Sequence, residues 1–579
     1  MESHLAAGYC AATGTYSSLH PPLATATAAS SFTDYLFRRL LTFPPDRPAF
    51  VDASTGAAVS FADLRTVALK VVGALAALGV RRGHVVLLLS PNSLHFPALS
   101  LGVLCLGAVL SAANPLLTPD ELAEQARDSE PFLAVATAEL APKLRSLASQ
   151  VVLVDQLLAD IDDHDAWACA EPDIGRGDPA LLFYSSGTTG RSKGVVTTHG
   201  NAIAMAASLV ITRGRDDDDD VDVYGCVLPM FHMFGFSAFV LGTPAMGATA
   251  VMVLGRFSAG KLLAAMEGFG VTTLLAVPPM VAEMAKEGAG DGEPPLHAST
   301  SVRQRLRLRE VVSSGAPLQR EHMARFRRCF PGVSLGQCYG LTETGIVTMC
   351  DLISPPLLRD GDGVEAGISS PPSMSVGRLV PSAEARIVDV ESGEALPPNR
   401  AGELWVRGPS VMQGYLGNHA ATAAALVRAP RDSPEDTAAG GRWLRTGDLC
   451  YVDARGLLHV VDRIKELIKY RAYQVAPAEL EDILAAHPGI HDVAVAPYPD
   501  EEAGEIPVAC VVRKSGSHLQ APEVLCFVED KVAPYKKIRK VVFVDTIPRS
   551  PSGKILRPQL KSLLQTGTVC ASSIGRSKI

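Results

Sequence analysis

Apolar residues in the first third of the chain form short runs that alternate with helical patterns. Val85 to Leu89 is an unbroken apolar run that ends at Ser90-Pro91-Asn92, which is typical of a buried strand leading into a turn. Similar alternation extends from Phe32 to about Asp155. Strands that alternate with helices predict βαβ units built around a parallel sheet.

The C-terminal part of the chain has a different pattern. Charged helical segments such as Ala476 to Ala486 alternate with strand-like runs such as Val493 to Ala496 and Val508 to Val512. This pattern predicts a separate small α+β domain that begins near Asp462-Arg463.

The predicted fold class is therefore α/β, with two domains of unequal size. A large N-terminal domain of packed α/β subdomains is expected over residues 31–462, and a small mobile α+β domain over residues 463–566. Residues 1–30 are rich in Ala, Ser and Thr without a clear period, so disorder is predicted there. Residues 567–579 are expected to be a flexible tail.

Two long stretches carry no Asp, Glu, Lys or Arg: Phe96 to Asn114 and Leu228 to Gly255. Proline and glycine interrupt both stretches, and neither has flanking aromatic belts. They are interpreted as buried core elements rather than membrane spans. The N-terminus lacks a basic region followed by an apolar one, so secretion is not expected.

Composition is that of a soluble globular enzyme. Of the 579 residues, 47% are hydrophobic and 20% charged, and the net charge of -8 gives no field that would attract nucleic acid. The 11 cysteines are scattered, with no CxxC pair, which argues for a reducing compartment and against structural zinc.

The chain ends in Ser577-Lys578-Ile579, one conservative step from the Ser-Lys-Leu peroxisomal address. The tail predicts recognition by a peroxisomal import receptor and a peroxisomal location. A chance ending is the alternative, and it would leave the protein in the cytoplasm.

The strongest local signal is a loop of small residues that follows the apolar run Leu181 to Tyr184. Backbone amides and hydroxyls of such a loop can approach an anion closely, and a lysine adds positive charge. No Gly-Lys-Ser/Thr closes the loop, so it is not a Walker A motif. Phosphate binding is favoured over a generic flexible loop. The residues concerned are Ser185, Ser186, Gly187, Thr188, Thr189, Gly190 and Lys193.

Five further motifs follow in order: Gln337 to Gly345, Gly402 to Gly408, Leu444 to Asp448, Asp462 to Lys469, and Pro551 to Lys554. Together with the small-residue loop, they make residues from about 30 to 565 resemble the adenylate-forming superfamily. That superfamily includes acyl-CoA synthetases, 4-coumarate–CoA ligases, luciferases and peptide-synthetase adenylation domains.

This resemblance implies an ATP-dependent ligase. A carboxylic acid and ATP would give acyl-AMP and pyrophosphate, and coenzyme A would then take the acyl group. Mg²⁺, ATP and coenzyme A are the expected cofactors and co-substrates. Luciferase-like oxygenation and carrier loading are rivals without support in the chain. A regulator that binds nucleotide or acyl groups without turnover stays open, because Cys338 and Ala472 depart from the family pattern.

The resemblance also implies a role for each matching residue. Attack on the α-phosphorus builds negative charge that positioned cations and donors must stabilise. The small-residue loop and Lys193 would hold the β- and γ-phosphates. The remaining assignments are Mg²⁺ for Glu343, the α-phosphate for Thr342, ribose for Asp448 and Arg463, adenine for Gly315 and Gln337, the substrate carboxylate for His232, and the bridge between carboxylate and α-phosphate for Lys554.

A second half-reaction would use the small domain, which rotates about a hinge in relatives. Lys465, Lys469, Arg471 and Arg256 are expected to face phosphates of nucleotide or coenzyme A. Ala472 stands where the family has glycine near the pantetheine tunnel, so adenylation is expected intact and transfer to coenzyme A slower.

Within the superfamily, the chain most resembles plant 4-coumarate–CoA ligases and their peroxisomal relatives. Its acid pocket departs from a hydroxycinnamate site, because Phe234 replaces a tyrosine, Ala238 a serine and Cys338 a glycine. Ile346 and Val347 are further expected pocket residues. A more apolar pocket should bind phenols less well, since a buried hydroxyl without a partner is costly. A hydroxycinnamate, a fatty acid and an oxylipin precursor all stay open as substrates.

Overall fold

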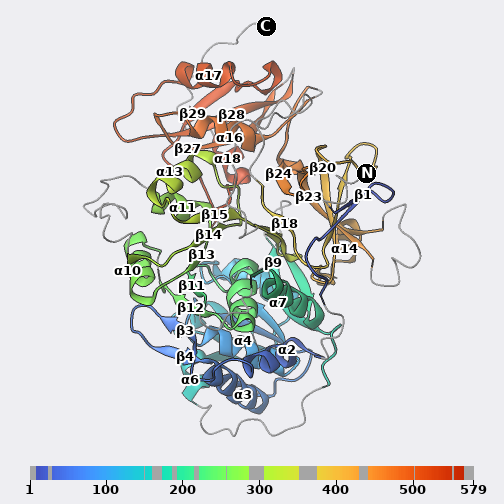
Figure 1. Ribbon diagram of the computed structural model, residues 1–579, viewed down its shortest axis with the longest axis vertical. Coiled ribbons are helices and arrows are strands. Elements are labelled where there is room, and N and C mark those ends of the chain that lie inside the picture. Colours follow the sequence, from blue (N-terminus) through green and yellow to red (C-terminus); the bar gives the residue numbers. More distant parts are fainter. Residues whose placement is uncertain are drawn as a thin grey trace.

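The computed structural model describes fourteen stretches of the chain, and these form five sheets and the helices around them (Figure 1). The described residues are 8–23, 29–145, 147–148, 150–159, 173–185, 192–213, 221–255, 257–285, 305–350, 375–428, 441–471, 473–500, 503–550 and 553–565.

Two seven-stranded, mainly parallel sheets form the body of the large domain, which confirms the α/β prediction. The first runs β21 (Gly414–Tyr415), β10 (Lys193–Thr198), β9 (Pro179–Ser185), β6 (Val109–Ala112), β5 (Val85–Leu89), β7 (Leu133–Ala136) and β8 (Val151–Leu153). The second runs β15 (Ser334–Gln337), β14 (Glu310–Ser313), β13 (Thr273–Ala276), β11 (Val223–Cys226), β12 (Thr249–Met252), β3 (Pro48–Asp52) and β4 (Ala58–Ser60).

Helices connect and cover these strands, as βαβ connections require. They are α2 (Phe32–Leu40), α3 (Phe61–Ala77), α4 (Phe96–Cys105), α5 (Pro119–Ser129), η1 (Ala141–Leu144), α6 (Val154–Ala159), α7 (His199–Arg213), α8 (Met233–Gly235), the π-helix η3 (Phe236–Gly242), α9 (Thr243–Met246), α10 (Ala259–Phe269), α11 (Pro278–Met284), α13 (Arg320–Cys329) and α14 (His419–Ala425).

A third, antiparallel sheet and a small three-stranded sheet complete the large domain. The antiparallel sheet contains β1 (Tyr9–Cys10), β2 (Thr15–Ser17), β19 (Glu384–Val388), β20 (Gly402–Arg407), β23 (Trp443–Val452), β22 (Leu426–Val427) and β24 (Leu458–Arg463). The three-stranded sheet contains β16 (Tyr339–Leu341), β17 (Gly345–Met349) and β18 (Arg378–Leu379).

The prediction of disorder over residues 1–30 is wrong for the segment that contains β1 and β2. β2 pairs with β19, so the N-terminal hairpin is an edge of the antiparallel sheet. Arg386 Nε donates to Thr15 Oγ1 at 3.0 Å, and Tyr16 is buried. Such short strands carry no readable period, and a distant strand supplies their stability.

The small domain begins where the chain leaves β24. It contains η4 (Ile464–Glu466), β25 (Ile468–Tyr470), β26 (Tyr473–Val475), α16 (Pro477–Ala485), β27 (Ile490–Asp500), β28 (Gly504–Arg513), α17 (Ala521–Glu529), η5 (Pro534–Lys536), β29 (Lys540–Phe543) and α18 (Arg557–Gln565). Its sheet has the order β26-β25-β28-β27, with β29 beside β28. Figure 1 shows this domain above α13, and α13 contacts α16.

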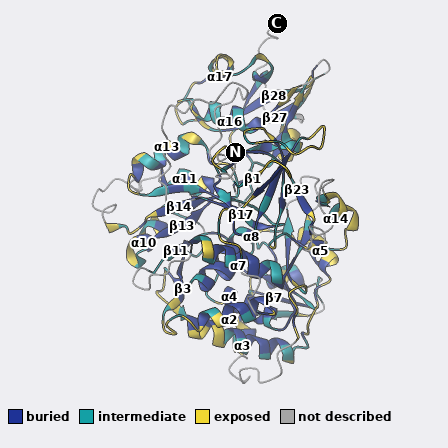
Figure 2. Cartoon of the chain, turned by 45° about the vertical axis from the view of Figure 1, so that its right-hand side comes forward, coloured by how far each residue is buried: buried dark blue, intermediate teal, exposed yellow. Residues whose placement is uncertain are grey.

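Burial follows the layers, with buried strands inside and exposed residues on outer helical surfaces (Figure 2). Both charge-free stretches are core, as predicted: α4 is almost wholly buried, and so are the helices around η3. Among the residues that the structure describes, no helix has the length and apolarity needed to cross a membrane.

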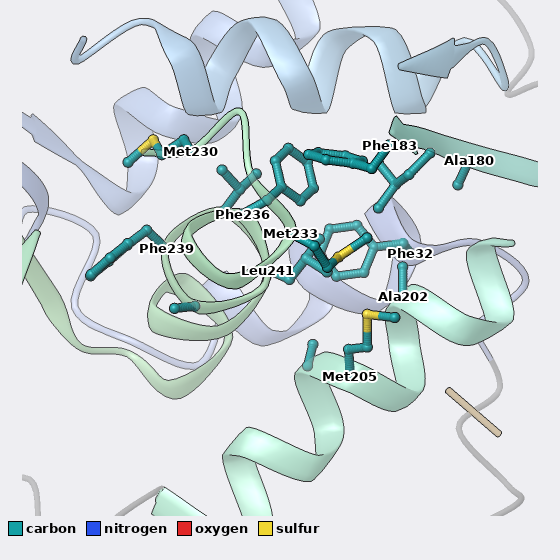
Figure 3. Packing of buried hydrophobic residues seen from close by; sticks show 14 of the residues in the cluster. Phe32, Ala180, Phe183, Ala202, Met205, Met230, Met233, Phe236, Phe239 and Leu241 are labelled. Atoms are coloured by element: carbon teal, nitrogen blue, oxygen red, sulfur yellow. The ribbon is translucent and has the colours of Figure 1, made fainter. Parts of the chain in front are cut away.

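One part of this core holds two elements of the site together. Phe183 of β9 and Phe236 of η3 pack edge to face with ring centroids 5.0 Å apart (Figure 3). Phe32, Met205 and Met233 surround them in the same cluster. The strand that leads to the small-residue loop and the helix beside the acid pocket therefore share one packed support.

Candidate active site

A cavity of about 1030 Å³ lies between the large and small domains. Its walls come from segments that directly follow β6, β9, β11, β13, β14 and β15, at the carboxyl ends of the parallel strands. Open α/β sheets usually bind ligands at this edge. The volume is sufficient for a nucleotide and a small acid together.

The phosphate-loop prediction falls on a hairpin. Ser185 ends β9, Lys193 begins β10, and the two residues are cross-strand partners that line the cavity. The loop residues Ser186, Gly187, Thr188, Thr189 and Gly190 lie outside the described residues. Lys193 Nζ lies 4.9 Å from the centroid of the Tyr415 ring.

Glu343 lies on the turn between β16 and β17 and lines the same cavity. Its Oε1 accepts a 3.0 Å hydrogen bond from the Tyr415 hydroxyl, and its backbone carbonyl accepts one from Met412 at 2.8 Å. Mg²⁺ at nucleotide sites is usually held by one or two carboxylates together with phosphate oxygens. One cavity-facing carboxylate near the phosphate hairpin therefore fits such an ion.

Asp448, on β23, is a buried carboxylate with two partners. The Tyr339 hydroxyl donates to its Oδ2, and Arg463 Nε lies 3.5 Å from its Oδ1. Burial raises the pKa of Asp448, while the charge of Arg463 and the Tyr339 hydrogen bond oppose that rise. The predicted ribose pair, Asp448 and Arg463, is therefore assembled across the β23–β24 ladder.

Gly315 and Thr342 line the cavity, but Gln337 does not. Gly315 has φ +86°, a left-handed conformation that favours glycine. Gln337 is buried, and its Oε1 accepts from the backbone N–H of Leu318 at 3.2 Å. It supports the turn that begins at Gly315, so its effect on adenine would be indirect.

His232 is placed at the start of α8 beside the acid end of the cavity. Burial and the positive charge of Lys554 lower the pKa of His232 to about 4, so the ring is neutral at neutral pH. Its Nδ1 accepts from the Phe234 N–H at 3.4 Å. The proton is thereby assigned to Nε2, which can donate to a carboxylate.

Lys554 enters the cavity from the small domain. Burial and the charge of Arg463 lower its pKa, while Asp448 and Glu343 oppose that effect. Ser550 fixes the loop, because Lys554 N–H donates to Ser550 Oγ at 3.1 Å and Ser550 N–H donates to the Lys554 carbonyl at 2.8 Å.

The acid end of the cavity is largely apolar. Three of the expected pocket residues, Phe234, Cys338 and Ile346, line it, and burial raises the pKa of the Cys338 thiol to about 11. The pocket predictions for Ala238 and Val347 are not matched by the cavity walls. Val347 alternates with Ile346 along β17 and faces the core, and Ala238 is buried within η3.

The predicted phosphate contacts on the hinge separate into two groups. Lys465 lines the cavity, whereas Lys469 and Arg471 are exposed on β25 and the turn after it. Arg471 has φ +53° and lies 5.7 Å from the Tyr470 ring centroid. Arg256 and Ala472 lie outside the described residues.

Several residues that line the cavity were not predicted from the sequence. Glu121, Glu124 and Asp128 on α5 form part of the wall, and α14 contributes alanines. The Tyr184 hydroxyl donates to Asp128 Oδ2 at 2.8 Å and ties α5 to β9. An amphipathic helix with a capping box looks like any surface helix, so only tertiary packing identifies these residues.

The fold and site define an ATP-dependent enzyme that activates carboxylic acids and transfers them to coenzyme A. The AMP-binding enzyme family model matches residues 36–416, and the model of its C-terminal domain matches residues 479–554. The chain belongs to the AMP-binding enzyme family, and its function is that of a carboxylate–CoA ligase.

Known proteins of this kind align along nearly the whole chain. 4-Coumarate–CoA ligase-like 8 of Oryza sativa subsp. japonica is 64% identical, over 97% of this chain and 98% of that protein. Peroxisomal OPC-8:0-CoA ligase 1 of Arabidopsis thaliana is 42% identical, over 89% and 90%. The crystal structure of ATP-bound MatB from Rhodopseudomonas palustris is similar with a TM-score of 0.77 at 28% identity, over 92% and 99%.

Proposed function

We propose that this ligase activates an acid with an apolar, non-phenolic body, with Mg²⁺·ATP, and transfers it to coenzyme A. The supporting observation is the single cavity in which Lys554, Asp448 and Glu343 meet an apolar wall. Ser237, a polar residue of that wall, donates its hydroxyl to the Phe234 carbonyl at 3.2 Å, so its proton is already engaged. A phenolic hydroxyl could not accept that proton and could use only the lone pairs of the Ser237 oxygen, so phenol recognition should be weak.

In the proposed first step, a carboxylate oxygen of the acid attacks the α-phosphorus of ATP. The bond to the bridging oxygen breaks, and pyrophosphate leaves. Lys554 neutralises charge on the carboxylate and the α-phosphate, and His232 orients the carboxylate through its Nε2–H. Lys193 holds the β- and γ-phosphates. Bound Mg²⁺ would supply charge neutralisation on the leaving pyrophosphate, held by Glu343 and phosphate oxygens.

In the proposed second step, the coenzyme A sulfur attacks the acyl carbonyl of acyl-AMP, and AMP leaves. Lys554 fills part of the cavity during the first step, so it must withdraw before a thiol can enter. A rotation of the small domain about residues 463–465 would withdraw it, because η4 begins directly after β24 ends. Lys469, Arg471 and Arg256 would then be available for phosphates of coenzyme A.

A peroxisomal site of action is part of the proposal. The residues Ser577-Lys578-Ile579 support it. The 42% identity to peroxisomal OPC-8:0-CoA ligase 1 of Arabidopsis thaliana supports it as well. Import would require an import receptor that reads isoleucine at the last position.

The test is mass-spectrometric detection of acyl-AMP and acyl-CoA from the purified full chain. ATP, Mg²⁺ and coenzyme A would be supplied with cinnamates, fatty acids and cyclic oxylipin acids, beside Lys554→Ala. Acyl-CoA from non-phenolic acids, lost in Lys554→Ala, is the expected result. A preference for hydroxylated cinnamates would contradict the proposed preference for non-phenolic acids. Absence of both products with every acid would favour a non-turnover regulator.

A further inference from the structure

We propose that Tyr415 is a positioning residue that couples nucleotide binding to Mg²⁺, through its hydroxyl on Glu343 and its ring on Lys193. The inference rests on the proposed function, because it assigns those two groups to metal and phosphate. Tyr415 belongs to β21, a two-residue strand at the edge of the first parallel sheet. It lines the cavity.

Backbone contacts fix Tyr415 independently of its side chain. β21 pairs with β10, with Tyr415 opposite Val195. The Tyr415 N–H donates to Thr422 Oγ1 at 2.9 Å, and the N–H of Leu416 donates to the Gly194 carbonyl at 2.8 Å. The tyrosine is thus anchored to the strand that leaves the phosphate hairpin.

The same segment also holds the turn that carries Glu343. The Met412 N–H donates to the Glu343 carbonyl at 2.8 Å, and the Tyr415 hydroxyl donates to Glu343 Oε1 at 3.0 Å. Glu343 is therefore held both at its backbone carbonyl and at its side-chain carboxylate. With one oxygen engaged by tyrosine, the other oxygen is oriented for a further ligand.

The ring of Tyr415 contacts the opposite charge. Lys193 Nζ lies 4.9 Å from the ring centroid, within the range of a cation–π interaction. No direct ion pair joins Lys193 to Glu343 in the part of the chain that the structure describes. Tyr415 therefore engages both charges while each remains available, one for phosphate oxygens and one for a metal ion.

Two substitutions separate the two contacts. Tyr415→Phe removes the hydroxyl and keeps the ring over Lys193, whereas Tyr415→Leu removes both. Tyr35→Phe is the matched control, because it deletes a phenolic hydroxyl from a buried residue of α2 outside the cavity. Thermal denaturation of each variant checks that the fold is retained.

The measurement is calorimetric titration of ATP into the full chain, once with Mg²⁺ and once with EDTA. Mg²⁺ should strengthen ATP binding to the unaltered protein. Tyr415→Phe should bind ATP normally in EDTA but lose roughly 5- to 20-fold of that strengthening, the effect of a charged hydrogen bond at a half-buried site. Tyr415→Leu should in addition lose about 2- to 5-fold in EDTA.

Two results would overturn the inference. One is an unchanged Mg²⁺ effect in Tyr415→Phe, and the other is equal weakening with and without Mg²⁺, which would mean a merely structural role. Because the titration requires no acid and no turnover, it stays informative if no acid is activated, so failure of the proposed function is seen separately. If turnover is present, the Mg²⁺ concentration for half-maximal pyrophosphate release should rise in Tyr415→Phe.

Discussion

The two halves of the active site are built in different ways. The nucleotide half is part of continuous sheets: Lys193 lies in a ladder with Ser185, and Asp448 pairs with Arg463 across β23 and β24. The lysine half depends on one loop of the small domain. Lys554 reaches the cavity only because that whole domain is docked against the large one.

Polar contacts between the small and large domains include two among the described residues. Asp462 Oδ2 accepts from the Ala478 N–H at 2.9 Å, and Arg320 lies 3.9 Å from Asp482. Within the small domain the contacts are stronger, since Arg557 is buried and donates to Glu466 and Glu481. A domain that is held together by buried ion pairs can move as one body, which suits it to presenting a lysine in one step and removing it in the next.

Removal of the lysine should affect the two steps most unequally. Lys554→Ala is expected to slow acyl-AMP formation by about 100- to 1000-fold, the range for loss of one positioned electrostatic group. Thioester formation from supplied acyl-AMP should change by less than about threefold, because the proposed domain rotation withdraws the lysine before that step. Rapid-quench measurement of the rate of each step tests this prediction. Equal rate losses in acyl-AMP formation and thioester formation would contradict a role for Lys554 in the first step alone.

The next prediction concerns the contact between the Lys554 loop and the large domain. Gly553 has φ +79°, and a Cβ there would lie 2.7 Å from Pro279 Cδ of the large domain. Gly553→Ala should therefore undock Lys554 and slow adenylation by about 5- to 150-fold, since overpacking at the docked contact costs about 1–3 kcal/mol.

Gly516→Ala is the control for that variant. Gly516 lies in the small domain with φ +76°, but a Cβ there has nothing within 4 Å. It should therefore lower the melting temperature without a selective loss of adenylation. If both variants slow adenylation equally, backbone strain rather than docking is responsible.

The same contrast explains what the sequence could predict. The run Val85 to Leu89 is β5 as expected, because that signal is local, and Ser185 and Lys193, which flank the small-residue loop, are cross-strand partners. β1 and β2 were missed because two- and three-residue strands owe their existence to a distant partner. Tyr415 was missed for a related reason: its importance lies in contacts with two residues far away in sequence.

Acid-pocket residues show a further limit. Of the pocket residues that the resemblance implied, Phe234, Cys338 and Ile346 line the cavity, whereas Ala238 and Val347 face the core. A one-residue step along a strand moves a side chain to the opposite face. Resemblance fixes the neighbourhood of a pocket, and packing decides which side chain enters it.

A pH profile would sharpen the comparison between the two steps. Burial and Arg463 lower the pKa of Lys554 below its usual 10.5, and only the charged form can neutralise the acid and phosphate. Adenylation should therefore decline as pH rises, with a midpoint below 10.5. Thioester formation from acyl-AMP should lack this decline. His232, with its pKa of about 4, should add no change between pH 5 and 8.

The smallest expected effect concerns the small domain during transfer of the acyl group to coenzyme A. Ala472, for which the resemblance to the family implies glycine, follows Arg471, whose φ of +53° lies in a region that disfavours side chains. Ala472→Gly should raise the single-turnover rate of thioester formation by about two- to fivefold, the effect of relieving about 0.5–1 kcal/mol of backbone or steric strain. Adenylation should stay unchanged, because the nucleotide half of the site belongs to other elements. A variant that accelerates both steps would mean that the residue acts on docking of the whole domain, and no acceleration at all would count against a restriction at this position.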